Sequence, residues 1–176
     1  MIEIIIGTMR PGAYSRKAGE VVFEIFKALG AEVGLIDLKD LPSEVFMPEA
    51  YEDRPRALGA FSDRLLAAKG IVIVTPEYNS SFPGVLKHFI DLWKFPDTFK
   101  RTFALVGVSN GNFGGIRSTD DLGKMLLNRG GLIFPEKVLL PNCESLFDAS
   151  GKMVDEKRID DHRAQAARIG SDGRAR

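Results

Sequence analysis

The segment from Gly7 to Arg16 combines glycine, hydroxyl groups and guanidinium groups directly after a short apolar run. Thr8 and Ser15 carry hydroxyls and Arg10 carries a guanidinium, all of which can donate hydrogen bonds to an anion. A helix is predicted to follow, and its free N–H groups and dipole also favour an anion. The alternative for Arg10 is an ordinary surface arginine, but a guanidinium between a buried strand and a helix start suits a phosphate. The segment therefore predicts a phosphate site.

A second polar segment follows the apolar run Ile71–Thr75. Pro76 has no N–H to donate to a sheet ladder, so the strand should give way to a loop with Glu77, Tyr78 and Asn79. Ligands of open parallel sheets bind outside the carboxyl ends of the strands, so we expect this loop to border a ligand. For Tyr78 the alternative is a ring that covers the end of the sheet. For Glu77 two interpretations stay open, a solvated charge and an ion pair between subunits.

A third segment, Ser109-Asn110-Gly111-Asn112-Phe113-Gly114-Gly115, follows the predicted strand Thr102–Val108 and also mixes glycine with hydrogen-bond donors. The glycine pair Gly114-Gly115 permits unusual backbone angles at the turn into a helix. It also permits close approach of the backbone to a ligand, and the two explanations are compatible.

Several other kinds of site are disfavoured. No Gly-x-Gly-x-x-Gly follows the first strand and no Gly-Lys-Ser/Thr ends its loop, so neither NAD nor ATP is expected as the resident ligand. The single cysteine, Cys143, cannot form an intrachain disulfide and is expected to be a small buried residue. The two histidines lack metal-ligand spacing, so we expect no metal site.

Strand-like and helix-like segments alternate along the chain. Apolar periodicity predicts helices between successive strands, at 18–29, 58–68, 86–93 and 122–126, with Asp53 available to cap the second and a fifth helix over 155–167. Segment 41–51 has no clear pattern. Five strands are expected: Ile2–Ile6, Glu32–Asp37, Ile71–Thr75, Thr102–Val108 and Leu132–Leu140.

This alternation predicts an α/β fold, a three-layer sandwich in which a five-stranded parallel sheet carries helices on both faces. In the flavodoxin-like strand order 2-1-3-4-5, the first, third and fourth strands are neighbours, and the phosphate of FMN binds at the switch point between the first and third. The three polar segments follow those strands. Loop chemistry and topology therefore agree on one ligand site.

Length and composition fit a single domain. The chain has 176 residues, which suits one domain over 1–169 with a short polar tail at 170–176 that we expect to be disordered. Basic and acidic residues both number 24, so no net field attracts nucleic acid or an anionic membrane. Met1 leads directly into the first strand, without a signal peptide, and no apolar run approaches the ~20 residues of a membrane span. We therefore expect a cytoplasmic protein.

At these residues the sequence resembles the NADPH-dependent FMN reductase family, flavodoxin-like proteins that include quinone, chromate and azo-dye reductases. The resemblance covers most of the chain. It rests on Gly7-Thr8-Met9-Arg10 with Ser15, on Pro76-Glu77-Tyr78-Asn79 continued by Pro83-Gly84, Leu86-Lys87 and Asp91, and on Gly114-Gly115. Many relatives have serine at the position of Ala13 and asparagine at that of Ser15, so the phosphate donors differ here.

The resemblance implies a set of cofactor-binding residues in the three loops. The first loop would bind the FMN phosphate, the second would border the isoalloxazine ring, and the third would lie on the other margin of the ring. The implied residues are Thr8, Arg10, Ser15, Arg16, Pro76, Glu77, Tyr78, Asn79, Ser109, Asn110, Gly111 and Gly114.

The implied function is an NAD(P)H-dependent oxidoreductase that passes hydride through FMN to quinones, free flavin or related acceptors such as azo dyes and chromate. The flavin is itself the redox agent, so no catalytic side chain is expected. NADPH or NADH would be the donor, and the family implies a homodimer or homotetramer. Two alternatives stay open: an electron-transfer module served by a protein partner, which the balanced charge disfavours, and a regulatory protein without flavin.

Overall fold

The computed structural model describes residues 1–94 and 96–172 and shows one twisted parallel sheet. Its strands follow the order β2-β1-β3-β4-β5, with β6 also paired to β4, and all these pairs are parallel. The predicted strand order is thus confirmed. The first four strands are β1 (Ile2–Ile6), β2 (Val33–Asp37), β3 (Gly70–Pro76) and β4 (Thr102–Val108).

The edge strand differs from the prediction. The prediction of a single strand over Leu132–Leu140 was wrong. The structure has two short strands there, β5 (Leu132–Ile133) and β6 (Val138–Leu140). Both pair with β4, and the segment between them contains Pro135. Proline has no N–H for the ladder, which explains a break at this edge position.

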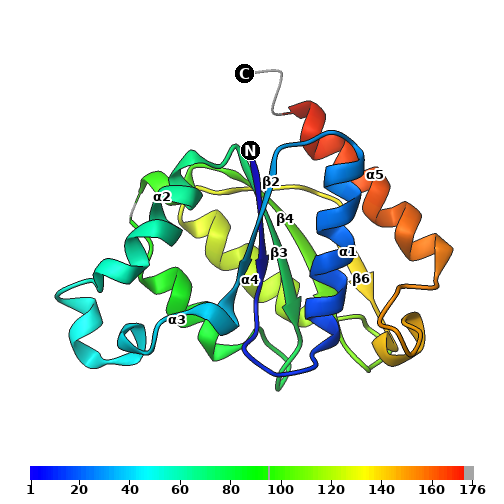
Figure 1. Cartoon of the computed structure of the whole chain (residues 1–176), viewed down its shortest axis with the longest axis horizontal. Helices are drawn as coiled ribbons and strands as arrows, with labels where there is room; N and C mark the ends of the chain where they lie inside the picture. The colour runs from blue at the N-terminus through cyan, green and yellow to red at the C-terminus, as the bar shows by residue number, and fades with distance from the viewer. Residues whose placement is uncertain (95, 173–176) are drawn as a thin grey trace.

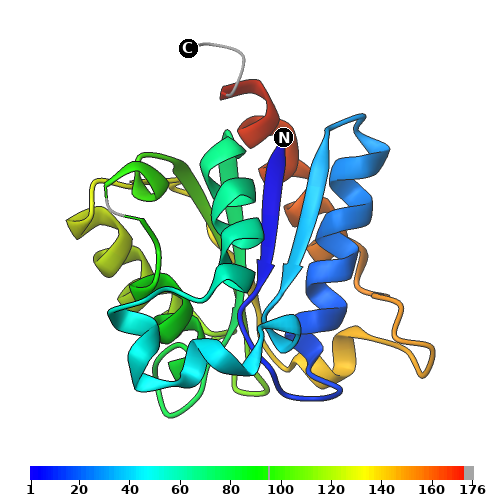
Figure 2. The same ribbon diagram turned by 60° about the vertical axis from the view of Figure 1, so that its left-hand side comes forward.

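Helices cover both faces of the sheet, so the predicted three layers are confirmed (Figures 1 and 2). Among the described residues, two α-helices pack on one face and three on the other. The first face carries α1 (Tyr14–Ala28) and α5 (Glu156–Asp172), and the second carries α2 (Gly59–Ala67), α3 (Gly84–Asp91) and α4 (Ile116–Asn128).

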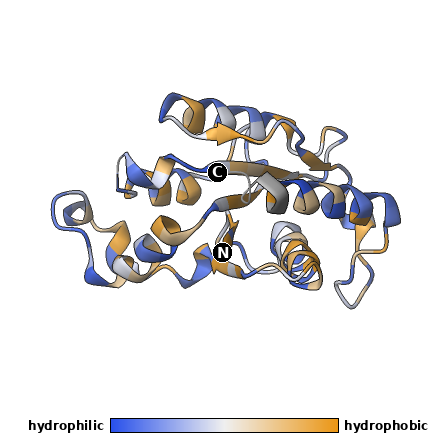
Figure 3. Cartoon of the chain, turned by 90° about the horizontal axis from the view of Figure 1, so that it is seen from above, coloured by the Kyte–Doolittle hydropathy of each residue, from blue (hydrophilic) through white to orange (hydrophobic). Residues whose placement is uncertain are grey.

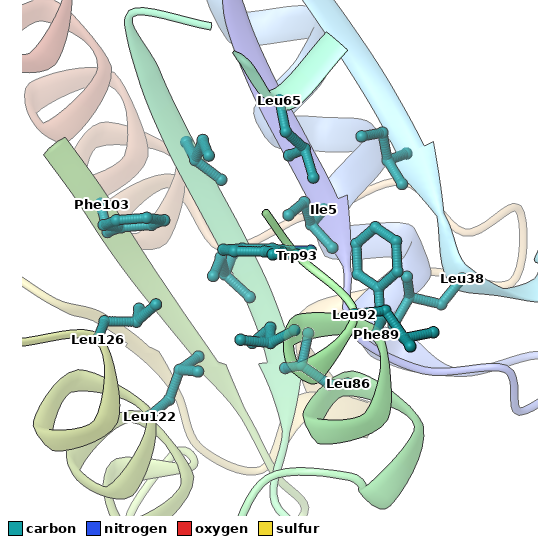
Figure 4. Close-up of a cluster of buried hydrophobic side chains, with 14 of the residues drawn as sticks. Ile5, Leu38, Leu65, Leu86, Phe89, Leu92, Trp93, Phe103, Leu122 and Leu126 are labelled. Carbon is teal, nitrogen blue, oxygen red and sulfur yellow. The ribbon is translucent and has the colours of Figure 1, made fainter. Parts of the chain in front are cut away.

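The sheet separates two apolar cores. On the α2–α3–α4 side, Ile5 and Phe103 of the strands meet Phe89 and Trp93 from α3 and the residues after it (Figure 4). The strands in the middle layer are coloured mostly as hydrophobic in Figure 3, as expected for strands covered on both faces. Among the described residues no helix combines the length and apolarity needed to cross a membrane.

Local details depart from the sequence-based expectation at three places. Asp53 does not cap α2, whose N-cap is Leu58 without a side-chain hydrogen bond. The segment 41–51 contains two short 3-10 helices, η2 (Ser43–Phe46) and η3 (Pro48–Tyr51). The last helix continues past 167 to Asp172, so the first residues of the expected tail are helical, and 173–176 lie outside the described residues.

An ion pair between a buried carboxylate and a partly exposed arginine lies near the amino end of β1. The carboxylate of Glu3 has no exposed surface, and Arg64 of α2 donates to it through Nε (3.1 Å) and Nη2 (2.6 Å). The same Nη2 donates to the carbonyl of Leu35 in β2, 2.9 Å away. Gly34 leaves room for the pair, because a Cβ there would lie 2.6 Å from both Glu3 oxygens. The arginine fork thus ties α2 to the first two strands.

Candidate functional site

The three polar loops meet at the carboxyl edge of the sheet, at the lower end of the strands in Figure 1. The first residues of two loops are hydrogen-bonded to the adjacent strand. The Gly7 N–H donates to Val74 O of β3 (2.8 Å), and the Glu77 N–H donates to Val108 O of β4 (3.0 Å). The Tyr78 hydroxyl lies 3.0 Å from Thr8 Oγ1, so the first two loops also touch through side chains. The prediction that these loops adjoin is confirmed.

The start of α1 has the features of an anion site. Its N-cap residue, Ala13, makes no side-chain cap, and the first turn contains no acidic residue. Ser15 Oγ is buried without a hydrogen-bond partner. Thr8, in the loop that leads into this helix, is almost fully buried. A buried hydroxyl without a partner is costly, and a bound oxyanion would satisfy it together with the free helix N–H groups. This donor set fits the phosphate of FMN.

The two arginines of the first loop have different environments. Arg10 is exposed, and its own N–H donates to Thr8 Oγ1 at 3.2 Å. Arg16 is committed to protein groups, because it donates to both carboxylate oxygens of Asp37, at 2.6 and 3.0 Å. Burial alone would raise the pKa of Asp37, but hydrogen bonds from Arg16 and the Lys39 N–H outweigh it and hold that pKa below its usual value.

The second loop is a tight turn. The N–H of Tyr78 donates to Ser81 O (2.9 Å) and the N–H of Ser81 donates to Tyr78 O (3.1 Å). Asn79 and Ser80 between them have φ of 50° and 65°. Positive φ at both central residues is the pattern of a type I′ turn and is uncommon for residues other than glycine. The turn presents the predicted ring-bordering residues on a defined backbone.

Two side chains of α4 hold this turn. Glu77 accepts from Arg117 Nη1 (3.0 Å) and from the Arg117 N–H (3.3 Å), so within this chain Glu77 belongs to an ion pair. Ser81 donates to Asp121 Oδ2 at 2.7 Å. Sequence reasoning missed both α4 residues, although their spacing of four on a helix places them on one face.

The third loop packs its backbone against β4. A Cβ on Gly107 would lie 2.6 Å from Gly114 O, and a Cβ on Gly115 would lie 2.6 Å from Val108 N. Gly114 and Gly115 also have φ of 60° and 82°. The close packing and the left-handed backbone both require glycine, as expected at a turn into a helix. Ser109 Oγ donates to Gly111 O (3.2 Å), so the start of the loop is closed on itself.

The side chain of Asn110 is held by the turn that follows β6. Its Oδ1 accepts from Cys143 Sγ (3.3 Å) and from the Glu144 N–H (3.2 Å), so the side chain anchors the turn η6 (Cys143–Leu146) that follows β6. Cys143 is buried as predicted, and burial raises the pKa of its thiol to about 11. The thiol is therefore a structural group at the rim of the site and not a nucleophile.

The arrangement offers binding groups rather than a catalytic apparatus. Within residues 1–94 and 96–172 no cluster of three or more His, Cys, Asp or Glu side chains could hold a metal ion. An anion site, a tight polar turn and a glycine-rich backbone lie on adjacent strands. Such a platform suits a phosphorylated planar ligand that brings its own reactivity.

Comparison with known proteins agrees with this geometry. The model of the family described as NADPH-dependent FMN reductase matches residues 1–145. An NAD(P)H-dependent FMN reductase of Pseudomonas aeruginosa is 31% identical over 159 residues, which cover 87% of this chain and 84% of that protein. A quinone reductase of Pseudomonas putida is 31% identical over 163 residues, covering 89% and 86%.

Among solved structures, the flavoenzyme FerB of Paracoccus denitrificans, an NAD(P)H:acceptor oxidoreductase, superposes with a TM-score of 0.78 at 24% identity and covers 96% of this chain and 93% of its own. A flavodoxin of Streptococcus pneumoniae gives a TM-score of 0.64 at 13% identity, covering 97% and 98%. These two likenesses show the fold. The match of the family model over most of the sequence shows more, and the chain belongs to the NADPH-dependent FMN reductase family.

Proposed function

We propose that this chain reduces quinones and related small acceptors with electrons from NAD(P)H, using FMN held over the three loops. The enzyme class and the cofactor are those of the family to which the chain belongs. The observation that carries the placement of the cofactor is the buried, unpartnered hydroxyl of Ser15 at an uncapped helix start. It supports the phosphate end of FMN at α1.

Each loop then has a part in holding the cofactor. Thr8, Ser15 and Arg10 with the N–H groups of α1 bind the phosphate, while the Tyr78–Asn79 turn and the backbone at Gly111 border the ring. When bound, FMN would supply the redox chemistry, namely hydride uptake from NAD(P)H and delivery of the electrons to the acceptor. The protein contributes position, a fixed ring environment and the exclusion of competing groups, without proton transfer by a named side chain.

The acceptor and the assembly are further parts of the proposal. The named relatives include quinone reductases and an FMN reductase, which supports quinones and free flavin as acceptors, with azo dyes and chromate as related ones. We expect a homodimer or homotetramer in the cytoplasm, where a reducing environment suits the single buried thiol of Cys143. Either NADPH or NADH is the donor.

The test is spectroscopic and kinetic. The purified full-length protein, incubated with FMN and desalted, should retain flavin absorbance, and anaerobic addition of NADPH should bleach it. Steady-state NADPH oxidation should then depend on an added benzoquinone. A protein that stays colourless after incubation with FMN would contradict the cofactor site. A bound flavin that neither NADPH nor NADH reduces would favour an electron-transfer module served by a protein partner.

A further inference from the structure

Arg16 makes a four-bond fork that joins the end of β2 to the first loop. Nε and Nη2 donate to the two oxygens of Asp37, at 2.6 and 3.0 Å. Nη1 donates to Arg10 O (2.8 Å) and Nη2 also reaches Thr8 O (3.3 Å). Both side chains are largely buried, with 14% of Arg16 and 8% of Asp37 exposed, so the pair is shielded from solvent screening.

The two carbonyls that Arg16 binds belong to the loop that supplies the phosphate donors. In a trans peptide the C=O and the following N–H point in opposite directions, so fixing Thr8 O toward Arg16 turns the Met9 N–H away from it. Carbonyl oxygens repel an anion. Because the Arg16 guanidinium donates to the carbonyls of Thr8 and Arg10, these two oxygens point toward Arg16. The fork thus fixes the direction of the loop's backbone dipoles.

Asp37 makes this arrangement specific. It sits at the last position of β2, paired in the sheet with Ile6, so it lies at the same edge as the first loop. Its carboxylate forms ion pairs with Arg16 and, at 3.3 Å, with Lys39 Nζ, and it also accepts from the Lys39 N–H at 3.1 Å. A guanidinium whose donors are divided between a carboxylate and two carbonyls has little left for a ligand.

We propose that Arg16 and Asp37 are a positioning pair: they hold the first loop in its anion-binding shape, and Arg16 is not itself a phosphate ligand. The inference rests on the proposed function, because it concerns the phosphate end of the same cofactor site. It predicts that the pair governs affinity for the phosphate of FMN and not for the ring. Riboflavin has the ring without the phosphate, so the ratio of the FMN and riboflavin affinities isolates the effect.

The experiment measures dissociation constants for FMN and riboflavin with full-length protein stripped of flavin, by fluorescence quenching. Arg16→Lys keeps the charge but loses the fork, since a lysine ammonium is a single point donor. FMN affinity should fall about tenfold, because a first loop that has lost its shape gives up about one charge-assisted hydrogen bond to the phosphate, while riboflavin affinity stays unchanged. Equal losses for both flavins, or no loss, would overturn the proposal.

Asp37→Asn separates positioning from direct binding and serves as a second variant if Arg16→Lys does not fold. If Arg16 contacted the phosphate, removing the carboxylate would free its charge and strengthen FMN binding. A positioning pair predicts the opposite, a selective loss of FMN affinity. Stronger binding of FMN by Asp37→Asn therefore overturns the proposal.

Arg64→Lys is the matched control, because Arg64 makes the same kind of fork with Glu3 and Leu35 O away from the loops. It should lower the melting temperature and leave the FMN to riboflavin ratio at the wild-type value. A changed FMN to riboflavin ratio in this control would mean that general destabilisation explains the effect of Arg16, and it would overturn the inference. A wild-type protein that binds FMN no better than riboflavin would instead contradict the phosphate site and with it the proposed function.

Discussion

Two arginine forks of the same chemistry lie at opposite ends of β1 and β2. Arg64 binds the buried carboxylate of Glu3 and a carbonyl within β2, near the amino end of β1. Arg16 binds Asp37 at the carboxyl end of β2 and two carbonyls within a loop. The first fork fixes strands that the sheet ladder already holds, whereas the second fixes a segment that has no ladder.

The role of a buried ion pair therefore depends on which backbone groups share it. A pair that adds to regular structure contributes to stability, and the removal of one partner leaves an uncompensated charge. A pair that orders a loop contributes to the shape of a site, as second-layer groups do around other ligands. The predictions below test this division.

The largest effect is expected from Arg64→Met. Glu3 would keep a fully buried carboxylate without its cation, so the free energy of unfolding should fall by about 3 to 5 kcal/mol. Urea denaturation followed by circular dichroism measures the loss. The FMN to riboflavin affinity ratio of the folded fraction should stay that of the wild type. A fall in that ratio would contradict a purely stabilising role of the Arg64 fork.

The dependence of folding stability on acid pH has a contribution from His162 that must be separated from that of Asp37. Both ring nitrogens of His162 are buried without partners, and burial, as the largest cause, lowers the pKa of this histidine from 6.5 to about 4. Neutral His162 therefore favours folding fully above pH 6.5, and this contribution is lost as the pH falls from 6.5 to 4. The loss approaches about 3 kcal/mol.

In His162→Leu the decline between pH 6.5 and 4 should be absent. The remaining acid sensitivity should include Asp37, whose lowered pKa makes its contribution full above about pH 3.8 and lost below it. Thermal unfolding at closely spaced pH values checks both steps. An unchanged decline in His162→Leu would contradict the assignment to that histidine.

Gly34→Ala perturbs the Glu3 fork through sterics alone. The new Cβ would lie 2.6 Å from both Glu3 oxygens and 2.8 Å from Arg64 Nη2, so the pair must shift at a cost of about 1 to 3 kcal/mol. Gly59→Ala, where nothing lies within 4 Å of the added Cβ, is the control and should be neutral or stabilising. Equal stabilities of the two variants would show that the pair relaxes freely.

The smallest effect is expected from Arg117→Gln. This arginine is half exposed, so loss of its ion pair with Glu77 should change stability by less than about 1 kcal/mol. The pair holds the turn that we propose borders the ring, so the affinities for FMN and riboflavin should decrease by the same factor. A selective loss of FMN affinity in this variant would indicate that Arg117 acts on the phosphate. It would contradict the proposal that the first loop binds the phosphate and the second borders the ring.

Much of the site could be predicted because strand exits are local in sequence. Apolar runs mark the strands, and the polar residues after 6, 75 and 108 are then placed at one edge by the topology of parallel sheets. Asp37 was missed although it ends the second strand, and the same edge argument applied to that strand would have included it. Its partner Arg16 is predicted to bind the cofactor, and the bonds of its guanidinium to Asp37 could not be predicted because they depend on how α1 packs beside β2.

Other features depend on contacts between distant segments. Arg117 and Asp121 act on a turn some forty residues earlier, as the Glu77–Arg117 and Ser81–Asp121 bonds show. Pro135 is a local sequence signal for the break between β5 and β6. The apolar residues on both sides of it nevertheless led to the prediction of one continuous strand. The bonds of the Asn110 side chain to the turn after β6 could not be predicted either, because the position of that turn follows only from the folded structure.

The environment of Cys143 has a practical consequence. A thiol with a pKa of about 11 is almost entirely protonated at neutral pH, and its burial keeps reagents away. Maleimide and iodoacetamide should leave the native chain unmodified. A cysteine introduced on the surface would therefore be the sole attachment point for a fluorophore or spin label, without prior replacement of the natural one.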